Sequence, residues 1–557
     1  MHSGSRVPWM LAAVLLATVL VAGPVAGQKN FAQKQAQVTQ QTNRQQPQST
    51  NTKKVSDSVT NLAQRIAGAI ANQKSKTEIF SPVSIAGALS LLLLGSGGKT
   101  QTELLNVMGL NPQELSFRDI HLSFGRLFQD LVSNEPSLEP LVTWRLNDKC
   151  NRLDDEDDYE DEPNAEAPNK QNETDLVMQI GNGIFAQNGT SFDPRYDKLA
   201  KDLYKSELQQ LDFVSDESHS VRVINNWVHN QTHGRISDIV SHISPDTILM
   251  IINTLYFRGL WEEPFQPLAT RNRRFYPNGP DGPDSFDVQT MAKSHCMPYY
   301  FWEEMNVRVV GVPYRQNVTM YIFLPTNSTR ELVQKLQKNI SAEKVNEIVT
   351  KMKMKSVTLL FPKMHISNSL SLKSVMQQLG LYSVFDRHQA DLYSLLHGTP
   401  SKQDLASKVG EMEAGDIFDL LEDTTENAIS ELKKHDPDCT IQYREGILRG
   451  ECLKSGCAFG GNKCVCCSEV AQDFRRRRRD IKVNMKPANE TIFVNEMLHK
   501  VDLSVNERGT EGGAATATLI DRISSQINFI VNGPFFMFIR EETTRLPLFY
   551  GNVYNPK

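Results

Sequence analysis

Two hydrophilic blocks interrupt an otherwise continuous globular pattern, and this arrangement limits what the chain can fold into. The first block covers about residues 147–174 and includes Asp154–Glu162, a run that is acidic at every position except Tyr159. The second covers about residues 397–487 and holds six of the eight cysteines of the chain. Removing both leaves roughly 400 residues in which apolar side chains recur at helix and strand spacings, without an internal repeat. We therefore predict one large domain, residues 58–557, that carries two insertions.

The N-terminus is typical of a secretory signal peptide. Arg6 supplies a positive charge, Met10–Val21 is an uncharged apolar run, and Val25–Gly27 offers the small residues of a cleavage site. The apolar run is too short to span a bilayer, which takes about 20 residues. We predict that residues 1–27 are a signal peptide and that the protein is secreted into the extracellular space, without a membrane span.

The segment after the signal is polar. Residues 28–57 are rich in Gln, Asn, Thr and Ser, and they carry too few apolar side chains to offset the entropy cost of folding. We predict a disordered arm here. A helical pattern begins at Ser58, after which apolar residues recur on one face: Val59, Leu62, Ile66 and Ile70.

Seven Asn-x-Ser/Thr sequons support export, because such a site receives a glycan only in a secretory compartment. They predict a glycoprotein. The acceptor residues are Asn172, Asn188, Asn230, Asn317, Asn327, Asn339 and Asn489.

The cysteines also suit an oxidising compartment. Six of them fall between Cys439 and Cys467, an even number in a short span, and we interpret this part as a small module held by disulfides. Six cysteines allow 15 pairings, so the connectivity stays open. Cys150 and Cys296 are left over, and they either pair with each other or stay free.

Composition and motifs argue against an enzyme or a nucleic-acid binder. The net charge of −5 over 557 residues lacks the basic excess of a nucleic-acid-binding protein. There is no Gly-x-Ser-x-Gly elbow and no His-Glu-x-x-His zinc helix. Gly98-Lys99-Thr100 resembles the end of a phosphate-binding loop, but Leu93 stands where that loop needs its first glycine.

Two charged runs have competing interpretations. The acidic run around Tyr159 is typical of a solvated, disordered loop, and the alternative is an electrostatic arm for a basic surface of a partner protein. Arg475–Arg479 could bind a polyanionic glycosaminoglycan, be cut by a convertase, or simply be exposed.

The C-terminal part of the sequence is the most specific. Asn495–Lys500 is followed by Val505–Glu511 and then by the small residues Gly512–Thr518. Asn532–Ile539 and Pro547–Pro556 come after them. These segments resemble the last strand, the hinge of the reactive-centre loop and the C-terminal strands of the serpin family.

Further motifs carry the same resemblance, in the same order as in the family. They are Phe80–Ala86, Gly181–Phe185, Ile224–Trp227, Gly234–Ile236, Phe257–Phe265 and Leu359–Lys363. The resemblance covers residues 58–557 apart from the two insertions.

This resemblance implies an α+β fold in which three β-sheets are surrounded by about nine helices. It also implies an exposed reactive-centre loop, Glu507–Pro534, that a serine protease attacks. The cut loop would then enter the main sheet as a new strand and trap the protease as an acyl-enzyme. No cofactor or metal is implied. The alternative is a non-inhibitory serpin that acts as a carrier, a chaperone or an adaptor through its Cys-rich insertion.

The hinge residues fit insertion into a sheet, since side chains on a strand alternate between its two faces. Glu507 and Gly509 begin the hinge. The uncharged inward face would take Thr510, Gly512, Ala514, Thr516, Thr518 and Ile520. The opposite face would take Glu511, Gly513, Ala515, Ala517, Leu519 and Asp521, so both carboxylates avoid the buried side.

Two bonds compete as the cleavage site. Counting from the hinge places the cut at Ile523–Ser524, which only an elastase-like pocket would be expected to accept. Arg522, one residue earlier, carries the guanidinium that a trypsin-like pocket binds through a buried carboxylate. We favour Arg522–Ile523 and a trypsin-like target.

Four other residues match family positions. Ser84, Asn225 and His499 match the polar cluster behind the opening of the main sheet, and Trp261 matches the aromatic residue at its upper end.

Overall fold

We describe a computed structural model of the chain. It describes residues 50–71, 75–133, 142, 144, 150, 176–396, 439–444, 447–452, 457–460, 463–466, 492–510 and 527–557. Several predictions from the sequence lie outside these residues. They are the signal peptide, residues 28–49 of the predicted arm, most of both insertions with Arg475–Arg479, the sequons Asn172 and Asn489, and the loop residues 511–526 with Arg522, Ile523 and Ser524.

A six-stranded sheet contains the hinge. Its order is β2-β1-β3-β15-β14-β9, and β3 also pairs with β14 directly. The β1–β2 and β3–β14 pairs are parallel, and the other pairs are antiparallel. The strands are β1 (Leu176–Gln187), β2 (Glu207–Leu211), β3 (Leu249–Leu260), β9 (Met364–Ser371), β14 (Glu496–Val505) and β15 (Gly509–Thr510).

An eight-stranded sheet forms the second layer, in the order β16-β8-β5-β6-β7-β17-β18 with β4 paired to β5. This layer is continuous because the 17 residues of β5 pair with β4 at one end, with β8 along the middle and with β6 at the other end. The strands are β4 (Arg271–Phe275), β5 (Phe286–Trp302), β6 (Val307–Pro313), β7 (Val318–Pro325), β8 (Lys353–Pro362), β16 (Ile527–Ile530), β17 (Phe535–Glu541) and β18 (Pro547–Val553).

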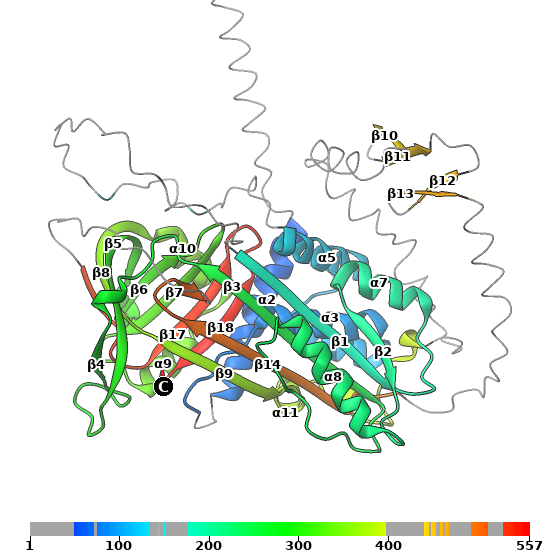
Figure 1. Ribbon diagram of the computed structural model, residues 1–557, viewed down its shortest axis with the longest axis horizontal. Coiled ribbons are helices and arrows are strands. Elements are labelled where there is room, and N and C mark those ends of the chain that lie inside the picture. Colours follow the sequence, from blue (N-terminus) through cyan, green and yellow to red (C-terminus); the bar gives the residue numbers. More distant parts are fainter. Residues whose placement is uncertain are drawn as a thin grey trace, which may run out of the picture. The chain divides into compact units, whose positions relative to one another are not determined.

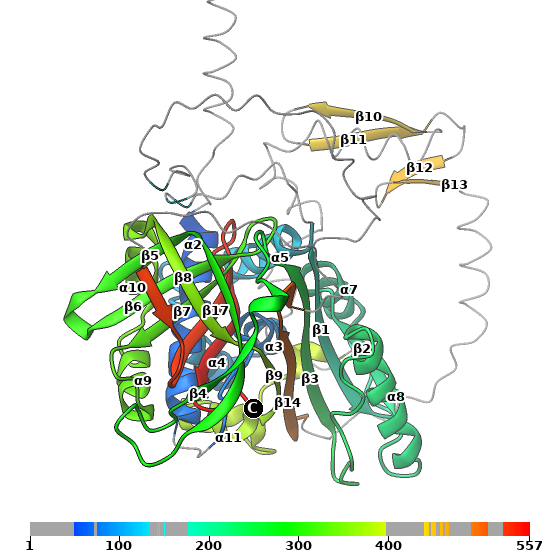
Figure 2. The ribbon, with the colours of Figure 1, turned by 60° about the vertical axis from the view of Figure 1, so that its left-hand side comes forward.

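Nine α-helices occur among the described residues, as expected, and they cover these sheets (Figure 1). Helix α3 is buried along its whole length and packs against β3 and β1 of the first sheet and β18 of the second, so it lies in the core between them (Figure 2). Helix α8 packs on the other face of β1 and β3. The helices are α2 (Thr50–Ile70), α3 (Pro82–Gly95), α4 (Gly98–Met108), α5 (Phe117–Ser133), α7 (Pro194–Tyr204), α8 (Glu217–Gln231), α9 (Arg330–Gln337), α10 (Ala342–Lys351) and α11 (Leu372–Gln378).

The first helix begins earlier than predicted. We expected a disordered arm up to residue 57, but α2 starts at Thr50. Its added turns bury Val55 and Ser56, and the Ser56 hydroxyl donates a hydrogen bond to the carbonyl of Thr544 at 2.8 Å. A contact with the distant β17–β18 turn therefore stabilises a segment whose own composition is polar.

The structure describes parts of both insertions. A disulfide joins Cys150 to Cys296 on β5, which settles the open alternative for these two cysteines and fixes the beginning of the acidic insertion to the second sheet. The Cys-rich insertion contains two hairpins, β10 (Cys439–Arg444) with β11 (Ile447–Cys452), and β12 (Cys457–Gly460) with β13 (Lys463–Cys466). Within the described ranges, no helix has the length and apolar character needed to cross a membrane.

Candidate functional site at the hinge of the main sheet

The hinge is a tight turn that reverses the chain from β14 into β15. The amide of Asn506 donates to the carbonyl of Gly509 at 2.9 Å, and the Asn506 side-chain oxygen accepts from the amides of Arg508 and Gly509. Asparagine stabilises turns through such local hydrogen bonds. Gly509 has to be glycine, because a Cβ atom there would overlap the carbonyl of Gly259.

Two aromatic residues hold this turn through its backbone. The indole nitrogen of Trp261 donates to the carbonyl of Asn506 at 2.9 Å, and the Trp261 amide donates to the carbonyl of Arg508 at 2.8 Å. The amide of Phe265 donates to the carbonyl of Glu507 at 2.8 Å. Three consecutive carbonyls of the hinge are thus bound by Trp261 and Phe265. The sequence assigned Trp261 to this end of the sheet, but it gave no indication of the role of Phe265.

The Glu507 carboxylate adds a polar anchor. It accepts a hydrogen bond from the Thr270 hydroxyl at 3.0 Å and pairs with the Lys363 ammonium at 3.1 Å. Partial burial opposes ionisation of Glu507, but these hydrogen bonds outweigh it and the pKa of the carboxyl falls below its usual value. The carboxylate is therefore ionised at neutral pH.

Thr510 lies on the buried side of the sheet. Its side chain is fully buried, and its hydroxyl shares a 2.9 Å hydrogen bond with the hydroxyl of Tyr314. The Tyr314 ring stacks on Trp261 with a centroid distance of 4.2 Å. The position of Thr510 agrees with the inward face that the alternation of the hinge requires. Tyr314 carries no sequence signal of this contact, since it follows an ordinary buried strand.

The main sheet is forked at the hinge. β3 and β14 pair directly from Met250↔Glu496 to Leu255↔Val501. Higher up, β15 lies between them and pairs through Thr510 with Gly259 of β3 and with Val505 of β14. The two strands are thus already separated at one end by the first residues of the loop.

A buried polar cluster joins β3 and β14 where they still pair. His499 and Asn253 are partners in the strand register, and the His499 Nδ1 donates to the Asn253 side-chain oxygen at 2.8 Å. The Asn253 amide donates to the carbonyl of Ser84 and to the side-chain oxygen of Asn182, both at 2.6 Å. The amide of Ser81 donates to His499 Nε2 at 3.0 Å, which fixes the proton on Nδ1. Complete burial lowers the pKa of His499 to about 3, so the ring is neutral at physiological pH.

One predicted member of this cluster lies elsewhere. Asn225 is on α8, where its side-chain oxygen accepts from the amides of Ile239 and Val240 and its amide donates to the carbonyl of Val240 at 2.8 Å. It therefore fixes the segment after α8, and Asn253 and Asn182 occupy the cluster instead. A signal for Asn253 was present, because Asn253 and Thr254 are the two polar residues within the otherwise apolar run Leu249–Leu255.

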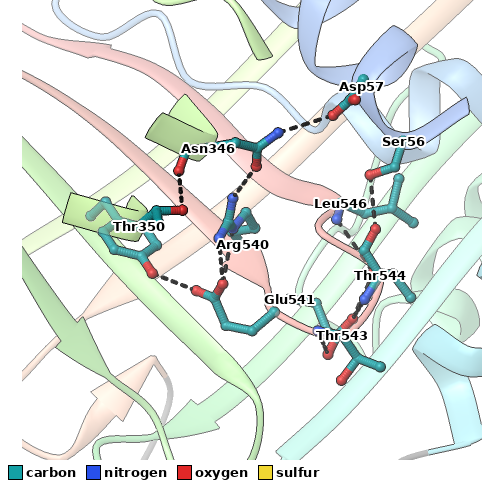
Figure 3. Close-up of polar contacts among 11 residues, drawn as sticks. Ser56, Asp57, Asn346, Thr350, Arg540, Glu541, Thr543, Thr544 and Leu546 are labelled. Atoms are coloured by element: carbon teal, nitrogen blue, oxygen red, sulfur yellow. Dashed lines mark hydrogen bonds and ion pairs between the residues drawn. The ribbon is translucent and has the colours of Figure 1, made fainter. Parts of the chain in front are cut away.

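A second polar cluster lies at the β17–β18 turn (Figure 3). Arg540 makes a buried ion pair with Glu542 at 2.6 Å and donates to the Asn346 side chain at 3.0 Å. Glu541 accepts from the amide and hydroxyl of Thr544. Arg540 and Glu542 pair with each other and Thr544 satisfies Glu541, beside a small polar recess, so we assign the cluster to stability.

The described sequons are accessible to different degrees. Asn317 is half-buried, and its side-chain amide donates to the Thr543 hydroxyl at 3.2 Å. The other four are exposed: Asn188, Asn230, Asn327 and Asn339.

Comparison with known proteins agrees with this architecture. Residues 57–431 and 468–556 match the family model described as "Serpin (serine protease inhibitor)", and the gap contains all six cysteines of the second insertion. Serine protease inhibitor 28Dc of Drosophila melanogaster is 30% identical over 90% of this chain and 80% of its own. The leukocyte elastase inhibitor of Xenopus tropicalis is 24% identical over 87% of this chain and 94% of its own.

Solved structures show the same fold. Human thyroxine-binding globulin in complex with thyroxine has a TM-score of 0.62 at 20% identity, and it aligns over 91% of this chain and 100% of its own. Mouse protein-Z dependent protease inhibitor has a TM-score of 0.61 at 18% identity, over 91% of this chain and 98% of its own. The chain belongs to the serpin family of serine protease inhibitors and is not an enzyme.

Proposed function

We propose that this serpin is an extracellular suicide inhibitor that traps its target protease by inserting the loop Glu507–Pro534 into the main sheet. The position of β15 carries this proposal. Gly509 and Thr510 already form a strand between β3 and β14, and further insertion would lengthen that strand along an existing register. A new central strand gains backbone hydrogen bonds on both edges, which is a strong driving force for loop insertion.

We propose a trypsin-like target and cleavage at Arg522–Ile523. The reasons are those of the sequence: a guanidinium fills a pocket with a buried carboxylate, and the loss of such a pair costs a protease more than a shift of one residue in a loop. The names of several relatives, among them rat α-1-antiproteinase, are consistent with inhibition as the activity.

The test is an incubation with trypsin and, separately, with elastase. We expect a complex with trypsin that survives denaturing electrophoresis, and a released C-terminal peptide that mass spectrometry identifies as beginning at Ile523. A peptide that begins at Ser524 would refute the arginine assignment. Arg522→Ala should abolish inhibition of trypsin. The absence of any stable complex with a panel of serine proteases would refute inhibition and favour the carrier alternative.

We also propose export and glycosylation, which residues 1–27 and the four exposed sequons support. Protein secreted from insect cells should begin near Gln28 and lose mass on treatment with an N-glycanase. Asn188→Gln should remove one glycan, whereas an unchanged mass would exclude that site.

A further inference from the structure

A buried lysine lies behind the aromatic residues that hold the hinge. Lys293, on β5, is only 6% exposed. Its ammonium donates to the carbonyl of Glu263 at 2.9 Å, and it lies 4.8 Å from the ring centroid of Phe265 and 5.7 Å from that of Trp261. At these distances a cation is attracted to the face of an aromatic ring.

These contacts connect Lys293 to the hinge turn indirectly, through the segment from Trp261 to Phe265. The two rings belong to the residues whose N–H groups bind the carbonyls of Asn506, Glu507 and Arg508. Glu263, which accepts from Lys293, lies between them in the chain. The segment from Trp261 to Phe265 therefore contacts both the hinge turn and the Lys293 ammonium.

The charge of this lysine changes near neutral pH. Burial is the main cause, and it lowers the pKa of Lys293 to about 7, against the opposing attraction of Glu263 and Glu262. The hinge turn that this segment holds carries Arg508 and Glu507, and Glu507 pairs with Lys363. On β8, the partner of Lys293 in the strand register is the apolar Leu359.

We propose that Lys293 is a positioning residue for loop insertion, because its ammonium holds the Trp261–Phe265 segment against the hinge turn and releases it when the charge is lost. This inference rests on the proposed function. The turn Asn506–Arg508 is the pivot from which β15 would lengthen, so a firmly held turn favours insertion over hydrolysis of the acyl-enzyme. Inhibition should accordingly become less efficient as the pH rises through 7.

The first test measures the number of inhibitor molecules consumed per trypsin molecule between pH 6 and 8.5. For the wild type we expect this stoichiometry to increase several-fold toward high pH. Lys293→Met should show the high value at every pH, and Lys293→Arg, which keeps a charge, should show a flatter profile near the low value. Lys353→Met, at an exposed position of the neighbouring strand β8, is the control and should behave as the wild type.

The second test does not need a protease. Amide hydrogen exchange of the peptide that covers residues 505–510, corrected for the intrinsic effect of pH, should show less protection at high pH in the wild type and at every pH in Lys293→Met. Thermal unfolding of Lys293→Met should be no easier than that of the wild type, because burial disfavours the ammonium in the fold.

The outcomes separate the two proposals. Wild-type exchange and a wild-type pH profile in Lys293→Met would overturn the role of Lys293. If the exchange changes as expected while no protein forms a complex with any protease, the positioning role stands and the proposed inhibitory function fails. A large loss of thermal stability in Lys293→Met would show a merely structural lysine and would also overturn the proposal.

Discussion

A charge at Thr510 should convert the inhibitor into a substrate. The Thr510 side chain is fully buried between β3 and β14 and shares a hydrogen bond with Tyr314. In Thr510→Arg that bond is lost, at about 1 kcal/mol, and the buried Tyr314 hydroxyl is left unpaired. Burying an unpaired guanidinium costs several kcal/mol more. A total near 5 kcal/mol lowers the population of the state in which residue 510 occupies the sheet by a factor of about 4 × 10³.

The assay follows the fate of the loop in the presence of trypsin. We expect Thr510→Arg to be cleaved in the loop without forming a stable complex, because insertion becomes slower than deacylation. The matched control is Ala515→Arg, which carries the same charge on the opposite face and should still form complexes. The reasoning is refuted if Thr510→Arg inhibits with the wild-type stoichiometry, or if Ala515→Arg is equally defective.

Two further predictions concern the buried cluster. His499 has a pKa of about 3 in the fold and an ordinary value near 6.5 when unfolded, so below pH 6.5 the unfolded chain binds a proton that the folded chain does not. Its contribution to stability is complete above pH 6.5 and falls as the pH drops toward 3, by about 2–3 kcal/mol at pH 4.5. Urea unfolding should show this loss, and His499→Gln should make the decrease less steep; an unchanged slope would contradict the assignment. Asn253→Ala should lower the unfolding free energy by about 3 kcal/mol, because it leaves three buried hydrogen-bond partners unpaired. Asn225 is only half-buried, so Asn225→Ala should lower it by about 1 kcal/mol. Equal effects in thermal unfolding would argue against Asn253 as the centre of the cluster.

The sequence was informative where local pattern and tertiary environment agree. The period-two alternation of the hinge placed Thr510 on the buried face, and the motifs around His499 and Trp261 placed both residues at the main sheet. Prediction from the sequence failed where a contact with a residue distant in the chain determines the local structure. Nothing local shows that Ser56 reaches Thr544 and extends α2, or that Cys150 lies against β5. Asn225 was assigned to the cluster from the resemblance alone, and only the pairing of β3 with β14 shows that Asn253 is the residue that faces His499.

The register of β15 makes one last prediction about how the loop crosses the cluster. Thr510 pairs with Gly259 on β3 and with Val505 on β14, both antiparallel. If β15 lengthens in this register, Thr516 comes between Asn253 and His499, which now bond to each other. Insertion must break that bond. The Thr516 hydroxyl is able to replace it, because it can accept from His499 and donate to the Asn253 side-chain oxygen.

Thr516→Val keeps the shape but offers no hydrogen bond, so it should leave His499 and Asn253 unpaired in the inserted state at a cost of about 2–4 kcal/mol. We expect slower trapping and a higher stoichiometry of inhibition, with little change in the stability of the uncleaved protein. Thr516→Ser should behave as the wild type, and Ala517→Val, on the opposite face, should have a smaller effect. Inhibition by Thr516→Val at the wild-type rate would mean that the loop does not pass between these two residues, and that the register seen at Thr510 does not continue down the sheet.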